Sequence, residues 1–444
     1  MKTCKFGGGP LANAAQIAKV LEIIRADKER RCIVVSAPGI ASPTDQKITD
    51  LLYTLVNPPC ETTRREAAAT IISRYQAIIN GLGLKIAFRL WFNEAIESLK
   101  HIKADRRKDF LASRGEYWMA QILAEALGYR FVDATSFVVF DGNGIFDLNE
   151  SKKWARATSL KRKLAEAEGI VVPGFYGTSI RYGGVITFPR DGSDISGAAV
   201  AFCIDADIYE NWKDVSGVMM ADPRIVENPR KIDALTFPEL RELAYMGAKV
   251  LHDEAILPAR MGNIPINVRN TNEPDDKGTL ISCKIDNDTR VPGSLIGIAG
   301  KKGFSVIRLE KAGMNNEVGF LRSTCQIMEN HGINVEHVPG GIDTLSVIVA
   351  NKDFEASRKS VIEKIGLACK PDLITVEVMA LICVAIHDMV ETPGVAARLC
   401  QSLSNAKINI RMINQGASAI SIIIGVNEKD YEEAVRAIYK DFTS

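Results

Sequence analysis

Thr3-Cys4-Lys5-Phe6-Gly7-Gly8-Gly9-Pro10 is the stretch of sequence that decides the fold. Its first four residues are typical of a short strand, and the glycines that follow predict a tight loop. Apolar residues at helical spacing then run from Leu11 to Ile24, and Cys32–Ser36 reads as a second, buried strand. This order of strand, glycine loop, helix and strand predicts an α/β sandwich with a mainly parallel sheet.

The rest of the first 280 residues continues the α/β pattern. Helices are expected over most of 61–128. Further strands are expected at 130–134, 137–141, 171–175, 185–188 and 265–268, with helices near 193–204, 238–247 and 253–261.

A polar, turn-rich segment, Asn272–Gly278, marks a boundary. Beyond it the order β-α-β-β occurs twice. Each copy has a glycine before its helix, at Gly319 and Gly394, and an asparagine in its second expected strand. The repeat predicts two similar small modules after the first domain.

Bulk composition indicates a globular protein of ordinary character. Of 444 residues, 46% are hydrophobic and 25% charged, and the net charge of +1 gives no reason to expect nucleic acid or a membrane surface as partner. Nine cysteines lie without paired spacing to one another or to the five histidines, which favours reduced thiols and no metal site. No apolar run is long enough for a membrane span, and a cytoplasmic location is expected.

Lys5 leads directly into the glycine loop. Glycines allow backbone amides to approach a phosphate closely, and a following helix presents its positive end. A lysine there could neutralise a transferring phosphoryl group. Neither a Walker-type nor a dinucleotide-binding fingerprint is present, and glycine turns after strands are common, so the alternative of a plain turn stays open.

Arg190-Asp191-Gly192-Ser193-Asp194 lies between an expected strand and an expected helix. Arg190 could clamp a carboxylate, Ser193 and the helix amides could bind an anion, and Asp194 could orient donors or act on a proton. An N-cap turn, in which Ser193 or Asp194 accepts from helix amides, explains the same residues equally well.

Two further charged residues can be explained either by a function or by ordinary helix-end chemistry. Lys249 follows a glycine turn at a helix end, where the helix dipole favours a cation without any function. Glu116 lies early in an expected helix, where an acidic residue is ordinary capping chemistry. His252 is interpreted as a packed or capping histidine.

Taken together, these segments resemble the aspartate kinases of the amino-acid kinase family. The matching pieces are Lys5–Gly8, Val34–Ser36, Ile48–Leu52, Ser113–Glu116, Pro173–Phe175, Arg190–Asp194, Asp222–Arg224 and Gly247–His252. The C-terminal repeat matches the family's paired ACT modules. The resemblance implies an amino-acid-kinase-type α/β sandwich over residues 1–283, followed by two ferredoxin-like βαββαβ ACT domains, at 284–374 and 375–444.

The resemblance implies an activity as well. It is the transfer of the ATP γ-phosphate to the β-carboxylate of L-aspartate, which gives 4-phospho-L-aspartate and commits aspartate to lysine, threonine and methionine synthesis. ATP and Mg²⁺ are then the expected cofactors, with Mg²⁺ bound mainly through the nucleotide phosphates.

Site residues are carried over by position. Lys5, Asp194 and Lys249 would be catalytic. Lys5, Gly7, Gly8 and Lys249 would contact phosphates, with Lys213, Asp214, Met219 and Arg224 on the nucleotide side. Aspartate would be held by Thr49, Glu116, Arg190, Asp191, Gly192 and Ser193. The effector stretch would comprise Met314, Val318, Gly319, Phe320, Leu321, Val335 and Glu336.

The sequence also departs from the family pattern. Gly9-Pro10 stands where the family usually has Thr/Ser-Ser, and Asp191 adds a carboxylate where the family has glycine. A second hypothesis is therefore a catalytically weakened relative that senses amino acids. A third, a kinase for glutamate or a nucleotide, fits the tandem ACT modules less well. The effector is expected to be lysine, threonine or both. A homodimer through the ACT modules is implied, with a tetramer as a further assembly.

Overall fold

The computed structural model describes residues 1–444 apart from 182, 190–191, 249–250, 252, 286–287 and 417–419. Its contacts divide the chain into two compact units. The first consists of Met1–Val218, Lys231–Phe237 and Lys249–Asp286. The second consists of Met219–Arg230, Pro238–Ala248 and Asn287–Ser444.

The first unit contains most of the helices. Its elements are β1 (Lys2–Phe6), α1 (Ala14–Arg25), β2 (Arg30–Val35), α2 (Ile48–Val56), α3 (Glu61–Gly81), α4 (Phe88–Ser98), α5 (Arg107–Leu127), β3 (Arg130–Phe131), β4 (Val139–Phe140), α6 (Leu148–Ala157), α7 (Leu160–Glu166), β5 (Ile170–Pro173), β6 (Tyr176–Ser179), β7 (Val185–Thr187), α8 (Ser193–Ile204), β8 (Ile208–Lys213), β10 (Lys231–Ile232), β11 (Ala234–Thr236), α10 (Ile256–Met261), β12 (Ile266–Asn270) and β13 (Thr279–Ser282).

The first unit is built on an eight-stranded sheet in the order β11-β13-β12-β8-β1-β2-β5-β3. Every neighbouring pair is parallel except β12 and β13. The expectation of a mainly parallel α/β sandwich is confirmed. Because β1, β2, β5 and β8 run in the same direction, their carboxyl ends lie along one edge, where ligands of parallel sheets usually bind.

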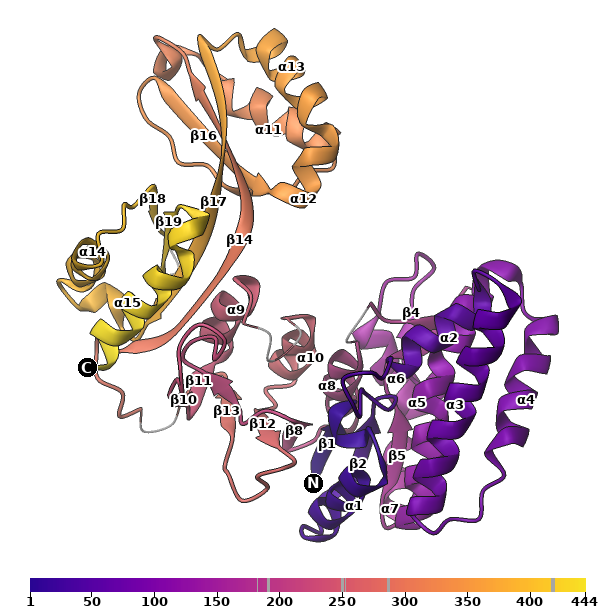
Figure 1. The fold of residues 1–444 in the computed structure, drawn as a ribbon. Coiled ribbons are helices and arrows are strands. Elements are labelled where there is room, and N and C mark those ends of the chain that lie inside the picture. The colour runs from indigo at the N-terminus through magenta and orange to yellow at the C-terminus, as the bar shows by residue number, and fades with distance from the viewer. Residues whose placement is uncertain (182, 190–191, 249–250, 252, 286–287, 417–419) are drawn as a thin grey trace. The chain divides into compact units, whose positions relative to one another are not determined.

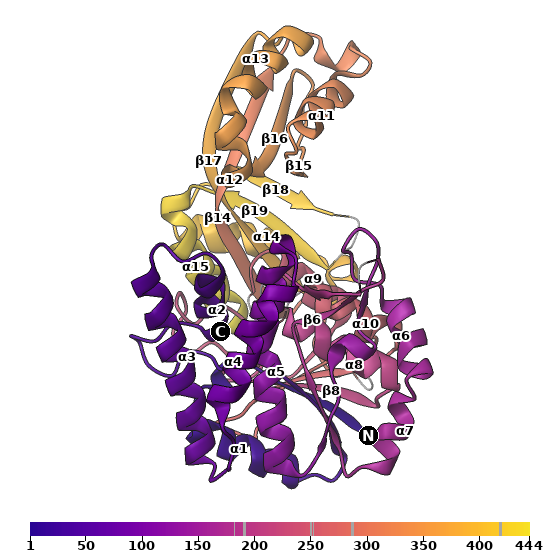
Figure 2. The ribbon, with the colours of Figure 1, turned by 90° about the vertical axis from the view of Figure 1, so that its right-hand side faces the viewer.

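Alternation along the central strands divides their side chains between two helical layers. On one face, Cys4, Phe6 and Val35 pack in a core with residues of α1, α2, α3 and α5. Figure 2 shows these four helices gathered together. On the other face, β1, β2 and β8 contact α8. Every residue of α8 is buried, so this helix is central to the unit.

The second unit contains α9 (Phe237–Tyr245) and the C-terminal repeat. Its other elements are β14 (Leu295–Glu310), α11 (Phe320–Asn330), β15 (Val335–His337), β16 (Thr344–Ala350), α12 (Asn351–Phe354), α13 (Arg358–Cys369), β17 (Leu373–Ile386), α14 (Val395–Asn405), β18 (Met412–Gln415), β19 (Ser421–Val426) and α15 (Tyr431–Thr443). The short strand β9 (Val218–Met219) lies where the two units divide.

The two predicted modules share a single six-stranded sheet, in the order β15-β16-β14-β17-β19-β18. Figure 1 shows β14 and β17 running side by side through both modules. The first module has the complete βαββαβ order. The second ends at α15 without a final strand, and the first half of β14 pairs with β17 in its place. The pairing is irregular between Lys301 and Phe304, where β14 passes from one module to the other.

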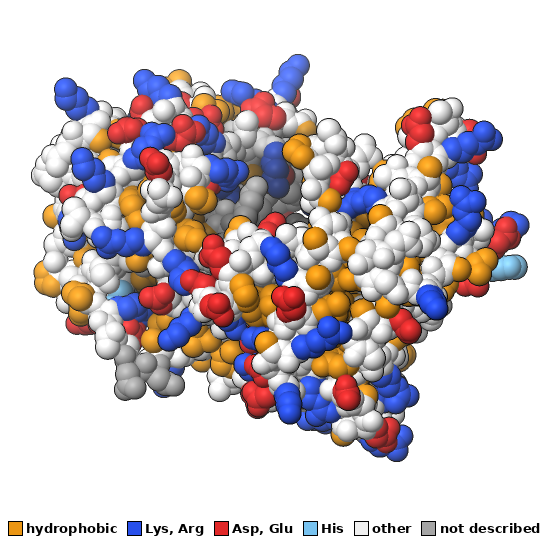
Figure 3. Space-filling view, turned by 60° about the horizontal axis from the view of Figure 1, so that its bottom comes forward, with side chains coloured by type: hydrophobic (Ala, Val, Ile, Leu, Met, Phe, Trp, Pro, Cys, Tyr) orange, Lys and Arg blue, Asp and Glu red, His pale blue; other side chains and the backbone are white. Residues whose placement is uncertain are grey.

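The surface has the mixed charge that the composition predicts. Lys and Arg side chains are interspersed with Asp and Glu over the face drawn in Figure 3. All nine cysteines are free. No described helix has the length and apolar character that crossing a membrane requires.

Candidate functional site

Side chains from β1, β8 and α8 meet at one carboxylate. Asp194, in the first turn of α8, has its Oδ1 atom 2.6 Å from the Lys5 Nζ and its Oδ2 atom 3.1 Å from the Lys213 Nζ. Asn211 donates from Nδ2 to Asp194 Oδ1 at 3.0 Å. Lys5 and Asn211 are register partners in the parallel β1–β8 pair, so both face α8. These four residues are called the Asp194 cluster.

The Asp194 cluster is buried, and its charges hold one another in place. The side chains of Lys5 and Asp194 are 6% and 4% exposed. Burial pushes the pKa of Asp194 upward, but the charges of Lys5 and Lys213 outweigh it and hold that pKa well below its ordinary value. An ionised carboxylate of this kind is a weak proton acceptor. Asp194 is therefore suited to orienting two ammonium groups rather than to moving a proton.

The N-cap interpretation of Ser193 and Asp194 is wrong. Gly192 occupies the N-cap position of α8, and neither Ser193 nor any other described side chain caps the helix. Ser193 instead accepts a hydrogen bond from the hydroxyl of Ser36 at 2.8 Å, and a Cβ at Gly174 would lie 2.9 Å from its own Cβ. The first turn of α8 is thus held close to the ends of β2 and β5.

The glycine loop after β1 forms close backbone contacts. Gly39 donates to the carbonyl of Gly8 at 2.8 Å, and a Cβ at Gly39 would lie 2.5 Å from the Gly8 carbonyl carbon. The Gly7 amide donates to Trp212 and is therefore occupied. Gly9 starts a one-turn 3₁₀ helix with Pro10, and a Cβ on Gly9 would lie 2.6 Å from the Asp214 carboxylate.

Glu116 is a buried carboxyl in α5. Burial raises its pKa to about 8, against the lowering effects of a hydrogen bond from the Ala37 amide and of the Lys5 charge. Its Oε2 atom is buried without a hydrogen-bond partner among the described residues. The capping interpretation is wrong, because Glu116 lies well inside α5. Thr49 lies in α2, which contacts α5, where Gly115 leaves room for Ile48.

The structure does not place some of the predicted site residues in the Asp194 cluster. Arg190, Asp191, Lys249 and His252 lie outside the described residues. Met219 and Arg224 belong to the second unit, where Arg224 pairs with Asp222.

The sequence patterns did not reveal Asn211 of the Asp194 cluster or the neighbouring Tyr209. Asn211 is fully buried, and Tyr209 donates from its hydroxyl to the Asp194 carbonyl at 3.1 Å. A Cβ at Gly197 would lie 2.5 Å from that hydroxyl, so only glycine leaves room for it on α8. Buried polar residues at alternate positions of β8 were the available signal, because such groups need partners.

The predicted effector residues have mixed environments in the first module. Met314 and Phe320 are buried in its core, whereas Val318 and Leu321 are exposed. Gly319 precedes α11 with a φ of 90°, a left-handed conformation that favours glycine. Val335 begins β15, and Glu336 accepts a hydrogen bond from Tyr245.

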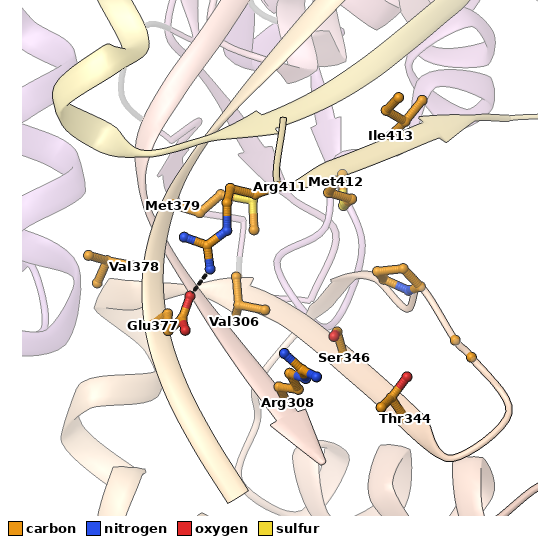
Figure 4. Close-up of a pocket in the computed structure, with 13 residues that line it drawn as sticks. Val306, Arg308, Thr344, Ser346, Glu377, Val378, Met379, Arg411, Met412 and Ile413 are labelled. Carbon is orange, nitrogen blue, oxygen red and sulfur yellow. Dashed lines mark hydrogen bonds and ion pairs between the residues drawn. The ribbon is translucent and has the colours of Figure 1, made fainter. Parts of the chain in front are cut away.

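A cavity of about 350 Å³ lies on the shared sheet of the second unit. Figure 4 shows Glu377 of β17 paired with Arg411. Arg308 of β14 and Ser346 of β16 also line the cavity. None of the predicted effector residues lines this cavity.

Comparison with known proteins shows which family the chain resembles. Residues 2–270 match the model of the amino acid kinase family, and residues 382–442 match an ACT domain model. Aspartokinase 3 of Bacillus subtilis is 38% identical over 100% of this chain and 98% of its own.

Solved structures agree with this comparison. The aspartate kinase of Clostridium acetobutylicum is 41% identical, with a TM-score of 0.91 and 100% of both chains covered. E. coli aspartokinase III has been solved with aspartate and ADP and with lysine and aspartate. Both structures are 25% identical and cover 100% of both chains, with TM-scores of 0.82 and 0.75. The chain therefore belongs to the amino acid kinase family and, within it, to the aspartokinases.

Proposed function

We propose that the chain is an ATP-dependent aspartate kinase that transfers the γ-phosphate of ATP to the β-carboxylate of L-aspartate. The product, 4-phospho-L-aspartate, begins lysine, threonine and methionine synthesis. The observation that carries the proposal is the Asp194 cluster, in which two ammonium groups share one buried carboxylate beside a glycine loop. The full-length likeness to aspartokinases supports the choice of substrates.

Lys5 and Lys249 would neutralise charge on the transferring phosphoryl group. Gly7 and Gly8 are assigned to the phosphates; because the Gly7 amide already donates to Trp212, Gly8 is the better-supported contact of the two. Lys213, Asp214, Met219 and Arg224 are assigned to the nucleotide. The nearness of Lys213 to Asp194 supports a position for it beside the terminal phosphates.

Aspartate is assigned to Thr49, Glu116, Arg190, Asp191, Gly192 and Ser193. The strongest support comes from Glu116, because a buried carboxylate oxygen without a partner suits the substrate ammonium. Arg190 would then bind a substrate carboxylate through two parallel hydrogen bonds.

The chemistry fits a phosphoryl transfer driven by positioning and charge. A carboxylate nucleophile is already ionised at neutral pH, so no general base is required. Asp194 keeps Lys5 and Lys213 oriented before the substrates arrive. Mg²⁺ is expected to enter on the nucleotide phosphates. Bound there, it would spread their negative charge.

Trapping of the acyl phosphate with hydroxylamine tests the proposal. We expect aspartyl hydroxamate to form only with both ATP and aspartate, and glutamate neither to react nor to compete. Absence of hydroxamate would favour the weakened, amino-acid-sensing relative instead. Gly9, one of the departures from the family pattern that favour the weakened relative, has a structural explanation. A side chain at residue 9 would clash with Asp214. Gly9 thus fits this loop as it stands.

Regulation is proposed to run through the ACT modules, with lysine, threonine or both as inhibitor. The lysine complex of E. coli aspartokinase III supports an amino-acid effector. Exposed Val318 and Leu321 support a homodimer through the first module, with a tetramer as a further assembly. We assign the enzyme to the cytoplasm. Activity titrations with each amino acid, and sedimentation of the full chain, test these assignments.

A further inference from the structure

A second cavity of the first unit lies apart from the Asp194 cluster. It has a volume of about 560 Å³ and is bordered by residues 101–103 and 105–106, the first half of α5, the segment after β3 and residues 183–185. Of the residues assigned above to ATP or aspartate, none that the structure describes lines it. We call it the Arg114 pocket, after its most constrained cation.

Arg114 is half-buried and held rigidly. Its guanidinium lies 4.2 Å from the ring centre of Tyr117 and 4.6 Å from that of Phe110. Its Nε and Nη2 atoms donate to the hydroxyl of Ser113 at 3.2 and 3.0 Å. Among the described residues, no carboxylate forms an ion pair with Arg114 and nothing accepts from its Nη1. A half-buried guanidinium with a spare donor and no counter-ion is unusual, because most such groups are paired.

The rest of the lining adds positive charge. Lys103 lines the same cavity, and Arg106 lines it as one partner of an ion pair with Asp105. The two acidic residues of the lining are engaged locally. Asp133 accepts from the amide of Thr135 at 2.9 Å and from a tyrosine hydroxyl, and Asp105 lies 3.4 Å from Arg106 Nε.

We propose that the Arg114 pocket binds a small phosphate-bearing anion. Arginine is suited to phosphate oxygens, and stacking on two rings fixes its orientation before a ligand arrives. The volume falls within the range of small-molecule sites and exceeds what a single chloride or water needs. The site lies outside the kinase chemistry and does not depend on the function proposed above.

Calorimetric titration with inorganic pyrophosphate tests the proposal on the full-length chain. The Lys5→Ala variant serves as the parent, so that phosphate contacts in the Asp194 cluster are reduced. Pyrophosphate should bind this parent, and adding Arg114→Met should weaken its dissociation constant by about tenfold or more. Arg89→Met, which removes an exposed arginine of α4 outside the pocket, should leave binding unchanged.

A second variant tests the proposal in case Arg114→Met fails to fold. Lys103 is exposed, so Lys103→Gln should keep the thermal unfolding profile and still weaken pyrophosphate binding severalfold. Equal affinity in the parent, Arg114→Met and Lys103→Gln proteins would overturn the proposal, as would a Lys5→Ala parent that binds no pyrophosphate. Malonate that binds as tightly as pyrophosphate would overturn the assignment to phosphate.

Discussion

Lys5 is the residue on which the proposed chemistry depends most. Its ammonium is nearly inaccessible to solvent and lies against Asp194, so it is already positioned when the nucleotide binds. We expect Lys5→Ala to lower kcat by roughly 10²–10³-fold or more, the usual loss when one oriented charge donor is removed. Lys213 and Asn211 would still hold Asp194, and the fold should persist.

Initial rates and circular dichroism check this prediction. Lys19→Ala, which removes an exposed lysine of α1, is the matched control and should keep the parent rate. Near-normal turnover of the Lys5→Ala protein would show that the phosphate assignment is wrong.

We predict that aspartate binding releases a proton from the Glu116 carboxyl. With a pKa of about 8, its carboxyl is mostly protonated at pH 7 in the free enzyme. Contact with the substrate ammonium favours the ionised form, so about one proton should be released for each aspartate bound. Calorimetry in buffers of different ionisation enthalpy measures that release. Glu116→Gln should abolish it, while Glu125→Gln, an exposed position on the same helix, should not.

The same raised pKa makes stability depend on pH. The folded state holds the Glu116 proton more tightly than the unfolded state, so its contribution is complete below the ordinary pKa of 4.5. That contribution is lost as the pH rises from 4.5 towards about 8. Denaturant titrations should show Glu116→Gln gaining stability relative to the parent over this window. Parallel pH profiles for the two proteins would contradict the assignment.

At the scale of elements, two loops are locked together at the end of the parallel sheet. A Cβ at Gly39 would meet the backbone of Gly8 at 2.5 Å, and backbone cannot move aside cheaply. Gly39→Ala should therefore displace the loop after β1 and raise the KM for ATP about tenfold, since small misplacements in phosphoryl transfer are costly.

Gly366→Ala is the control for the glycine prediction. Gly366 lies within α13, and a Cβ there would meet nothing within 4 Å. Alanine should stabilise that helix by about 0.5–1 kcal/mol without changing the kinetics. Steady-state kinetics and thermal unfolding of both variants measure the contrast. An unchanged KM in Gly39→Ala would show that the loop tolerates movement.

Sequence patterns predicted some elements and not others, for physical reasons. The apolar run of β2 and the spaced apolar residues of α1 each carry one clear periodicity. Strand β8 was missed because it carries Glu210 and Asn211, both buried, among its apolar residues. Their partners, such as Arg30 on Glu210 at 2.8 Å, come from distant segments, and no local pattern reveals such pairs.

The module boundary was hard to read from the sequence for a similar reason. Residues 295–301 form the first half of β14 and pair with the second half of β17, a partner that no sequence pattern indicated. A local pattern identifies a strand but not its partner, because pairing depends on contacts far apart in the chain. The places of Arg190 and Lys249 stay predictions.

At the scale of the whole molecule, regulation and assembly are expected to depend on the same surface. Val318 is fully exposed beside Leu321, which is 48% exposed, and apolar side chains on a predicted effector stretch suit burial between two copies of the chain. Val318→Asp should weaken dimer formation by about tenfold or more, because a charge would be buried at the contact. It should also reduce inhibition by lysine or threonine. Val390→Asp, at a 60% exposed position of the second module, is the control. Sedimentation and inhibition curves measure both effects, and an unchanged dimer constant for Val318→Asp would place the contact elsewhere.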